Sequence, residues 1–286
     1  MKENEVSQSH FDRVLIAIPS LGRPMAILKK TFALVNGAGI PFKIFVEKQE
    51  EFLYKHYCGY KNVEILPESG QGIGYSRNRM RDYAKANGYE FIFELDDDID
   101  WFERLDTNDK QESLRMCVTD FVEAMDRFPK CGGIRMTHYR FWIYTKKDMQ
   151  KWDAFNKHLI WASFMRLSAL PPMSDKYTHF EDMAISLLLW REGYFTLNYG
   201  LAGVHVMQNQ GKGGCNMGNR TKMAEEAIVE IKKEFPKAFQ KDAKSYFGVN
   251  IDVDFYMKAY HCHSIKCKSD DELEDYLVRN PYLNAL

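Results

Sequence analysis

Residues 91–98 read FIFELDDD, and this stretch decides the fold class that the sequence predicts. It opens with a largely apolar run of strand length, and three aspartates follow without a gap. Branched and aromatic side chains in such a run are typical of a strand buried in a sheet. A similar run at residues 14–18 stops at the loop 19–24, whose glycine and two prolines end regular structure.

Strand and helix patterns alternate along the chain. Further strands are expected at 42–46, 63–66, 133–136, 159–165, 195–197 and 204–207, and helices at 27–35, 76–87, 110–127, 179–192 and 221–235. This alternation predicts an α/β fold with a mostly parallel, Rossmann-like central sheet flanked by helices. We expect a single domain, with a flexible tail at 1–11, a catalytic domain at 12–210, and a C-terminal loop and helical extension at 211–286.

The composition is that of an ordinary globular protein, with 45% hydrophobic and 28% charged residues. The net charge of -1 gives no overall basic field, so a nucleic acid would have to bind a local basic patch. The N-terminus is polar, and no apolar stretch is long enough to span a bilayer. We therefore expect a cytoplasmic protein without a membrane partner, and no oligomeric state is predicted.

The cysteines show no repeating spacing, which predicts reduced thiols. The tract 261–267 contains two histidines and two cysteines that could bind zinc, but their spacing matches no standard zinc finger. Ordinary surface or core residues are the favoured interpretation of this tract.

The three aspartates that end the stretch 91–98 predict a metal site. Side chains alternate along an extended chain, so Asp96 and Asp98 are expected to point one way and Asp97 the other. Carboxylates about 4 Å apart repel by on the order of 1 kcal/mol in water, and several times more when partly buried. A divalent cation such as Mg²⁺ or Mn²⁺ removes this repulsion, and ligands bind at the carboxyl ends of parallel strands. The alternative is an acidic turn that faces solvent.

Four motifs, taken in order, resemble those of a GT-A glycosyltransferase. The first is IAIPS at 16–20 with the following Arg23-Pro24, and the third is the aspartate cluster. The second, GIGYSRN at 72–78, is similar to a Gly-x-x-x-Ala-Arg-Asn element, with Ser76 in place of the usual alanine. The fourth is HFED at 179–182 with the leucines, arginine and glycine that follow it. More narrowly, the chain resembles the TET-associated glycosyltransferases, phage enzymes thought to add sugars to hydroxymethylated pyrimidines in DNA.

The resemblance implies a metal-dependent, inverting transfer of glucose or arabinose from a UDP-sugar. It implies Asp182 as the general base with Glu181 beside it, and Asp98, Asp96 and His205 as metal ligands. The implied donor contacts are Pro19, Ser20, Arg23, Gly72, Arg77, Asn78, Asp96, Asp97 and, in a glycine-rich loop, Lys212. Simpler interpretations stay open: a surface arginine at position 77, a core histidine at 205, a plain connector at 211–214, and acidic residues that only begin a helix at 181–182.

The resemblance also implies 5-hydroxymethylcytosine in phage DNA as the acceptor. Residues 138–144 interleave aromatic side chains with a cation and could grip an extruded base, or could form a core strand. The expected acceptor contacts are Tyr139, Arg140, Trp142 and Trp161. A local basic bias that could follow phosphates comes from Arg220, Lys222, Lys232, Lys233, Lys237, Lys241 and Lys244. A surface glycan or small metabolite as acceptor, and a non-catalytic DNA- or nucleotide-binding protein, remain alternatives.

Overall fold

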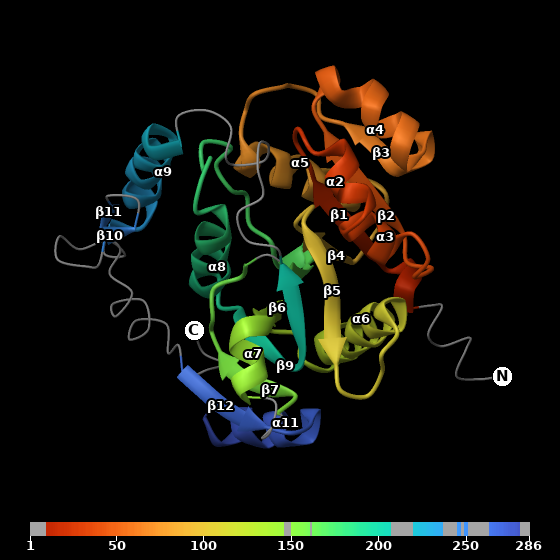
Figure 1. The fold of residues 1–286 in the computed structure, drawn as a ribbon. Helices are drawn as coiled ribbons and strands as arrows, with labels where there is room; N and C mark the ends of the chain where they lie inside the picture. The colour runs from red at the N-terminus through yellow and green to blue at the C-terminus, as the bar shows by residue number, and fades with distance from the viewer. Residues whose placement is uncertain are drawn as a thin grey trace.

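The computed structural model describes residues 10–145, 150–160, 162–206, 220–236, 245–246, 249–250 and 263–280. Within these residues ten strands form one sheet in the order β12-β7-β9-β6-β8-β4-β1-β2-β3, and β5 pairs with β9 outside this path (Figure 1). The strands are β1 (Val14–Pro19), β2 (Phe42–Val46), β3 (Val63–Ile65), β4 (Phe91–Leu95), β5 (Ile99–Arg104), β6 (Cys131–His138), β7 (Trp152–Phe155), β8 (Ala162–Arg166), β9 (Phe195–Val206) and β12 (His263–Cys267). A separate pair consists of β10 (Ser245–Tyr246) and β11 (Val249–Asn250).

Helices lie on both faces of the sheet. Figure 1 shows α8 and α9 on the left of the sheet and α6 on the right. The α-helices are α2 (Pro24–Leu28), α3 (Thr31–Val35), α4 (Glu51–Cys58), α5 (Ile73–Ala86), α6 (Lys110–Arg127), α7 (Tyr139–Thr145), α8 (Glu181–Arg191), α9 (Arg220–Glu234) and α11 (Asp270–Arg279). Short 3₁₀ turns occupy Lys48–Glu50, Tyr60–Asn62 and Leu167–Ala169.

Strand direction divides the sheet into two halves. β1 pairs in parallel with β2 and β4, and β2 pairs in parallel with β3, so the carboxyl ends of these strands meet at one edge. In the other half only β6 and β9 are parallel, while β8, β7, β12 and β5 each pair in an antiparallel direction. The predicted α/β class is confirmed, but the prediction of a mostly parallel sheet is wrong because apolar runs indicate strands without indicating their direction.

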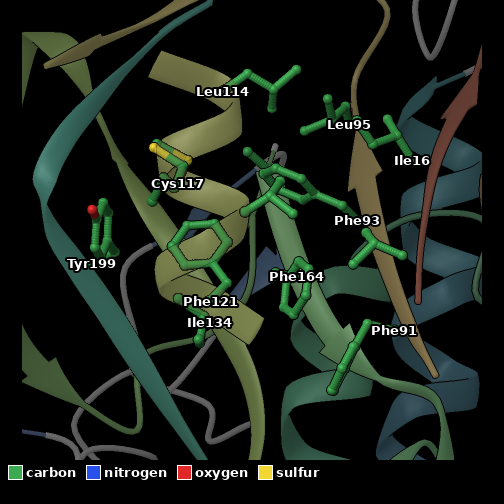
Figure 2. Close-up of a cluster of buried hydrophobic side chains, with 14 of the residues drawn as sticks. Ile16, Phe91, Phe93, Leu95, Leu114, Cys117, Phe121, Ile134, Phe164 and Tyr199 are labelled. Carbon is green, nitrogen blue, oxygen red and sulfur yellow. The ribbon is translucent and has the colours of Figure 1, made fainter. Parts of the chain in front are cut away.

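The face of the sheet beneath α6 carries an aromatic core. Figure 2 shows Phe93, Phe121 and Phe164 among its labelled side chains, and the ring of Phe93 lies 5.7 Å from that of Phe121 and 5.8 Å from that of Phe164. Asp109 caps the start of α6, and its side chain accepts hydrogen bonds from the backbone N–H groups of Gln111 and Glu112 in the first turn. The opposite face packs under α5 and α8 and contains Ile92 from β4 and other buried apolar residues.

Several elements differ from the expected ones. The predicted helix at 27–35 is two short helices, and the two strands expected at 195–197 and 204–207 are one long strand, β9. The segment 138–144, considered as a core strand, lies in the helix α7 apart from His138, which ends β6. Part of the predicted C-terminal extension also belongs to the sheet, because β12 pairs with β7 and the apolar side chains of α11 join the main core.

None of the helices in the described residues combines the length and the apolar composition needed to cross a bilayer.

Candidate active site at the carboxyl ends of β1 and β4

A buried arginine on α5 joins two of the motifs predicted to form the active site. Arg77 Nη1 donates to Glu94 Oε2 at 2.8 Å, and Nη2 donates to Asp96 Oδ1 at 3.0 Å. Its Nε donates to Glu181 Oε1 at 3.0 Å, so the guanidinium ties the end of β4 to the start of α8. Arg77 is 7% exposed, so a surface arginine is excluded. The predicted bidentate contact with a donor phosphate is not favoured either, because three carboxylates already accept from this side chain.

Glu94 is the buried centre of this network and was not predicted from the sequence. The residue is 1% exposed, and Arg81 donates to its two oxygens at 2.7 and 3.2 Å. Burial alone raises the pKa of Glu94, but the guanidinium groups of Arg81 and Arg77 outweigh burial and hold it below its ordinary value. A charged residue inside a buried strand requires a partner, and two arginines four positions apart lie on one helix face. These two signals together could have predicted the network.

We expect Arg77→Ala to lower the free energy of unfolding by about 3 kcal/mol, because it leaves buried carboxylates without their cation. Urea denaturation measures this change. The matched control is Arg79→Ala on the same helix, since Arg79 is 35% exposed and pairs with Asp82 one turn away. An exposed pair of that kind contributes less than about 1 kcal/mol. Equal losses in the two variants would contradict the role given to Arg77.

The three aspartates after β4 do not follow the expected alternation. Asp97 accepts from Ser20 Oγ at 2.6 Å and from Arg23 Nη1 at 2.9 Å. Asp98 Oδ2 lies 3.6 Å from the same nitrogen of Arg23, whereas Asp96 faces α5. The prediction that Asp96 and Asp98 share one direction is therefore wrong. β4 ends before the cluster, and the alternation of an extended chain does not apply in the turn that follows.

Asp96 and Asp98 are half-buried carboxylates that a cation would stabilise. Burial raises the pKa of Asp96 to about 7 and that of Asp98 to about 6, and the repulsion of neighbouring carboxylates adds to both shifts. Within the described residues, no cluster of three or more His, Cys, Asp or Glu side chains could hold a metal ion. Two carboxylates nevertheless fit Mg²⁺, which commonly binds one or two protein carboxylates and takes substrate phosphates and waters as its other ligands. The Mg²⁺ or Mn²⁺ ion stays a prediction.

Hydrogen bonds hold the loop after β1 against the aspartate turn. Because the hydroxyl hydrogen of Ser20 is donated to Asp97, the Tyr54 hydroxyl at 2.7 Å must donate to Ser20 Oγ. The backbone N–H of Arg23 in turn donates to the Tyr54 oxygen at 3.0 Å. Thr31 Oγ1 donates to the Asp96 carbonyl at 2.7 Å and accepts from a backbone N–H of β5 at 2.9 Å. The structure thus brings together Ser20, Arg23 and the aspartates, and the end of β1 at Pro19 leads into this loop.

The glycine-rich start of α5 explains how Arg77 reaches α8. Gly72 has a φ of 87°, which favours glycine, and an added Cβ would lie 3.0 Å from Thr178. At Gly74 an added Cβ would lie 2.3 Å from the backbone oxygen of Tyr177, so only glycine permits this close approach. Asn78 donates to the Met173 carbonyl at 2.8 Å and so fastens the segment before α8. Donor contacts by Gly72 and Asn78 stay predictions, since the contacts of these residues are within the protein.

The start of α8 presents two carboxylates with different surroundings. Glu181 is buried and paired with Arg77. Asp182 Oδ1 accepts from the backbone N–H of Met183 at 2.7 Å. Burial raises the pKa of Asp182 to about 7, and the charge of Glu181 adds to the shift. Asp182 also lines a cavity of about 10 Å³, beside Arg77 and other residues, which is room for about one water molecule.

His205 is placed apart from the aspartates. Its ring is stacked between those of Trp101 at 3.8 Å and Tyr139 at 3.7 Å, and its Nε2 lies 2.8 Å from Glu103 Oε2. Burial lowers its pKa, against the opposing effect of Glu103. Because no described cluster of three ligands could hold a metal, His205 does not complete a site with Asp96 and Asp98. The alternative of a hydrogen-bonded, partly buried histidine describes it better.

The predicted acceptor residues separate into different environments. Trp142 is fully buried, its Nε1 donates to the Gly200 carbonyl at 2.7 Å, and an added Cβ at Gly203 would lie 2.8 Å from its ring. A grip on an extruded base by Trp142 is therefore wrong, because both its ring and its donor are used inside the protein. Tyr139 is half-buried and Arg140 is exposed on α7. Trp161, Lys212, Lys237, Lys241, Lys244 and positions 261–262 of the predicted zinc tract lie outside the described residues.

The fold and the site define a mixed α/β domain whose acidic turn and loops gather at the carboxyl ends of parallel strands. A scan against family models matches the TET-associated glycosyltransferase model over residues 14–214, and the chain therefore belongs to that family. Family membership makes the protein a glycosyltransferase by class, which implies a sugar donor and an acceptor.

A structure described as that of A197 from STIV is similar to this chain with 12% sequence identity and a TM-score of 0.38. The match covers 69% of this chain and 86% of the other. A search of curated proteins finds no match to the sequence.

Proposed function

We propose that this glycosyltransferase moves a sugar from a UDP-sugar to a hydroxyl group on DNA, in a reaction that depends on a divalent cation. The observation that carries this proposal is the bridge formed by Arg77 between Asp96 and Glu181. It places the start of α8, with Asp182, beside the aspartate turn. A diphosphate held at the turn would therefore have a carboxylate base close to its sugar.

Different residues of the chain serve the nucleotide and the cation of the donor site. Ser20 and Arg23 fix Asp97 and keep the loop after β1 against the turn, so the two loops form one surface for the nucleotide. Asp96 and Asp98 supply the carboxylates for the cation. When bound, such a cation acts as a Lewis acid that stabilises the negative charge of a departing nucleoside diphosphate.

Asp182 suits the role of general base towards the acceptor hydroxyl. A base works best when its pKa lies near the working pH, and burial brings the pKa of Asp182 to about 7. The deprotonated carboxylate can accept the hydroxyl proton. Direct attack of that oxygen on the anomeric carbon inverts the configuration of the sugar. Glu181, fixed by Arg77, positions the start of the helix.

The proposed acceptor is 5-hydroxymethylcytosine in DNA, and the proposed sugar is glucose or arabinose. The acceptor rests on the resemblance of the motifs to enzymes that modify DNA bases. In addition, α9 carries the exposed cations Lys232 and Lys233 and contacts α8 through the Arg191–Glu234 ion pair. Release of UDP from UDP-glucose, measured with and without hydroxymethylcytosine DNA, tests the function. Stimulation by the modified DNA supports it, whereas equal release with unmodified DNA would point to another acceptor.

We expect the double change Lys232→Glu, Lys233→Glu to weaken binding of duplex DNA most strongly at low salt, because it reverses charges that attract phosphates. Fluorescence anisotropy at several salt concentrations measures the effect, with an expected loss of about tenfold or more at the lowest salt. The matched control is Lys266→Glu, Lys268→Glu, which reverses two exposed lysines in and beside β12, and Figure 1 shows β12 at the bottom of the fold, below α9. Equal behaviour of the two double variants would exclude α9 as a DNA-binding surface.

A further inference from the structure

A row of polar side chains crosses the sheet beside the proposed active site. Glu94 on β4 pairs in register with Ser163 on β8. Ser163 pairs in turn with Arg135 on β6, and Arg135 pairs with Asn198 on β9. Partners on neighbouring strands point to the same face of a sheet, so all four lie on the face that α5 and α8 cover elsewhere. Polar groups in such a place are costly unless they are paired or used for binding.

The end of this row at Asn198 is fixed by its hydrogen bonds. Asn198 Nδ2 donates to Thr137 Oγ1 at 2.7 Å and to Asp153 Oδ1 at 2.5 Å. Because both amide hydrogens are in use, the amide oxygen must face the other way, where it accepts from Arg135 Nε at 2.7 Å. Asn198 therefore sets the orientation of the Arg135 guanidinium.

Arg135 differs from Arg77 and Arg81, the α5 arginines that pair with Glu94, in having no close carboxylate. Its two hydrogen-bond acceptors are neutral: the Asn198 amide and the His158 carbonyl, the latter at 3.0 Å from Nη1. Among the described residues no Asp or Glu oxygen lies within 4.0 Å of its nitrogens. Burial lowers the pKa of Arg135 to about 10, against the more distant charges of Asp153 and Asp182. A half-buried guanidinium in this state would gain an anion as a ligand.

Because Arg135 lies away from the donor loops, the anion that it would bind belongs to the acceptor. β6 lies two strands beyond β4 in the sheet, which is about 10 Å at the usual strand spacing. The loops proposed to hold the donor follow β1 and β4, whereas Asp182 lies close enough to Arg135 to act on its charge. Asp182 lines one small cavity with Glu94 of β4 and Ser163 of β8, and β8 lies between β4 and β6. A molecule that reaches the base from the side of β6 therefore meets this guanidinium.

We propose that Arg135 binds a phosphate group of the acceptor, next to the nucleotide that receives the sugar. A guanidinium presents N–H donors that match phosphate oxygens. Asn198 accepts from Nε of Arg135 and the His158 carbonyl accepts from Nη1, which leaves Nη2 and the second hydrogen of Nη1 for the ligand. This inference rests on the proposed function and narrows its acceptor to a phosphorylated one, either a DNA strand or a free nucleotide. A neutral glycan would leave Arg135 without its ligand.

The test compares three acceptors that differ in phosphate: a hydroxymethylcytosine oligonucleotide, 5-hydroxymethyl-dCMP and the 5-hydroxymethyldeoxycytidine nucleoside. We expect Arg135→Gln to raise KM for phosphorylated acceptors by about 10- to 100-fold, with little change in kcat and none in KM for the nucleoside. Arg135→Lys, which keeps the charge, should show a smaller rise. An effect confined to the oligonucleotide assigns the phosphate to the DNA backbone, and an equal effect on 5-hydroxymethyl-dCMP assigns it to the nucleotide itself.

Direct binding separates this inference from the proposed function. Titration of the oligonucleotide and of dCMP without donor should show weaker binding by Arg135→Gln and unchanged binding by Arg115→Gln, an arginine on α6 whose Nη1 donates to the Ala38 carbonyl. If the wild-type protein transferred no sugar but Arg135→Gln still bound the oligonucleotide more weakly, the proposed function would be refuted and the phosphate site would be supported. A KM that rises equally for the nucleoside, or affinities equal to wild type in both Arg135 variants, would overturn the phosphate site.

Discussion

The Asp98→Ala variant is expected to lose at least about 100-fold in kcat/KM for sugar transfer while keeping its fold. Asp98 is one of two half-buried carboxylates at the aspartate turn, and burial already disfavours its charged form. In the proposed reaction this charge is used to hold a cation against the donor diphosphate. Its removal leaves Arg23 paired with Asp97, so the loop after β1 keeps its position. Steady-state kinetics and circular dichroism of the same preparation measure the two parts of this expectation.

A neighbouring aspartate gives the matched control for this variant. Asp100 is half-buried and two residues further along, in β5. We expect Asp100→Ala to retain activity within about threefold, and added Mn²⁺ at high concentration to restore part of the activity of Asp98→Asn but none of that of Asp98→Ala. Wild-type activity in Asp98→Ala would place the cation elsewhere or remove it from the reaction.

The Asp182→Asn variant is expected to lose about 10²- to 10⁴-fold in kcat, the usual contribution of a general base. Binding of the UDP-sugar should stay unchanged, because Asp182 faces the acceptor in the proposed arrangement. A base acts in its deprotonated form, and burial raises the pKa of Asp182 to about 7. In the wild-type enzyme, kcat should therefore increase as the pH rises through 7 and level off above it.

The control for Asp182→Asn is Glu192→Gln at the other end of the same helix, where the side chain is exposed. This variant should keep both the rate and the pH profile of the wild type. If Asp182→Asn retained the rise in kcat with pH, another group would be the base. If it lost donor binding together with kcat, Asp182 would belong to the nucleotide site.

Strand positions could be predicted from the sequence where apolar runs were uninterrupted. β4 and α6 begin and end where expected, because a buried strand and a one-sided helix each leave a clear pattern. β9 was divided into two because Gly200 and Gly203 interrupt its pattern. An added Cβ at Gly200 would lie 2.4 Å from the Gln150 carbonyl, and the ring of Trp142 covers Gly203. These glycines permit close packing within a strand, and the sequence alone does not distinguish that from a loop.

The sequence predicted which residues form the candidate site, but not which of them form ion pairs and hydrogen bonds with one another. The motifs that contain Ser20, Arg77, Asp96 and Glu181 come together as expected. The sequence did not show that Arg77 would donate hydrogen bonds to three carboxylates, because Glu94 was counted as part of an apolar run. Arg135 was not singled out, because its neighbours Ser163, Asn198 and His158 lie on two other strands and in a loop. The placement of His205 between two aromatic rings likewise depends on β5, a strand that was not predicted.

The central claim is that this protein transfers a sugar from a UDP-sugar to modified DNA and needs a divalent cation at Asp96 and Asp98. The most direct measurement is the mass of nucleosides from hydroxymethylcytosine DNA after incubation with the protein, Mn²⁺ and a panel of UDP-sugars. The account predicts that one sugar of the panel adds a hexose or pentose mass to hydroxymethylcytosine, and that EDTA or Asp98→Ala abolishes this product. The same product at full yield in EDTA, or an unchanged nucleoside with every donor, would contradict it.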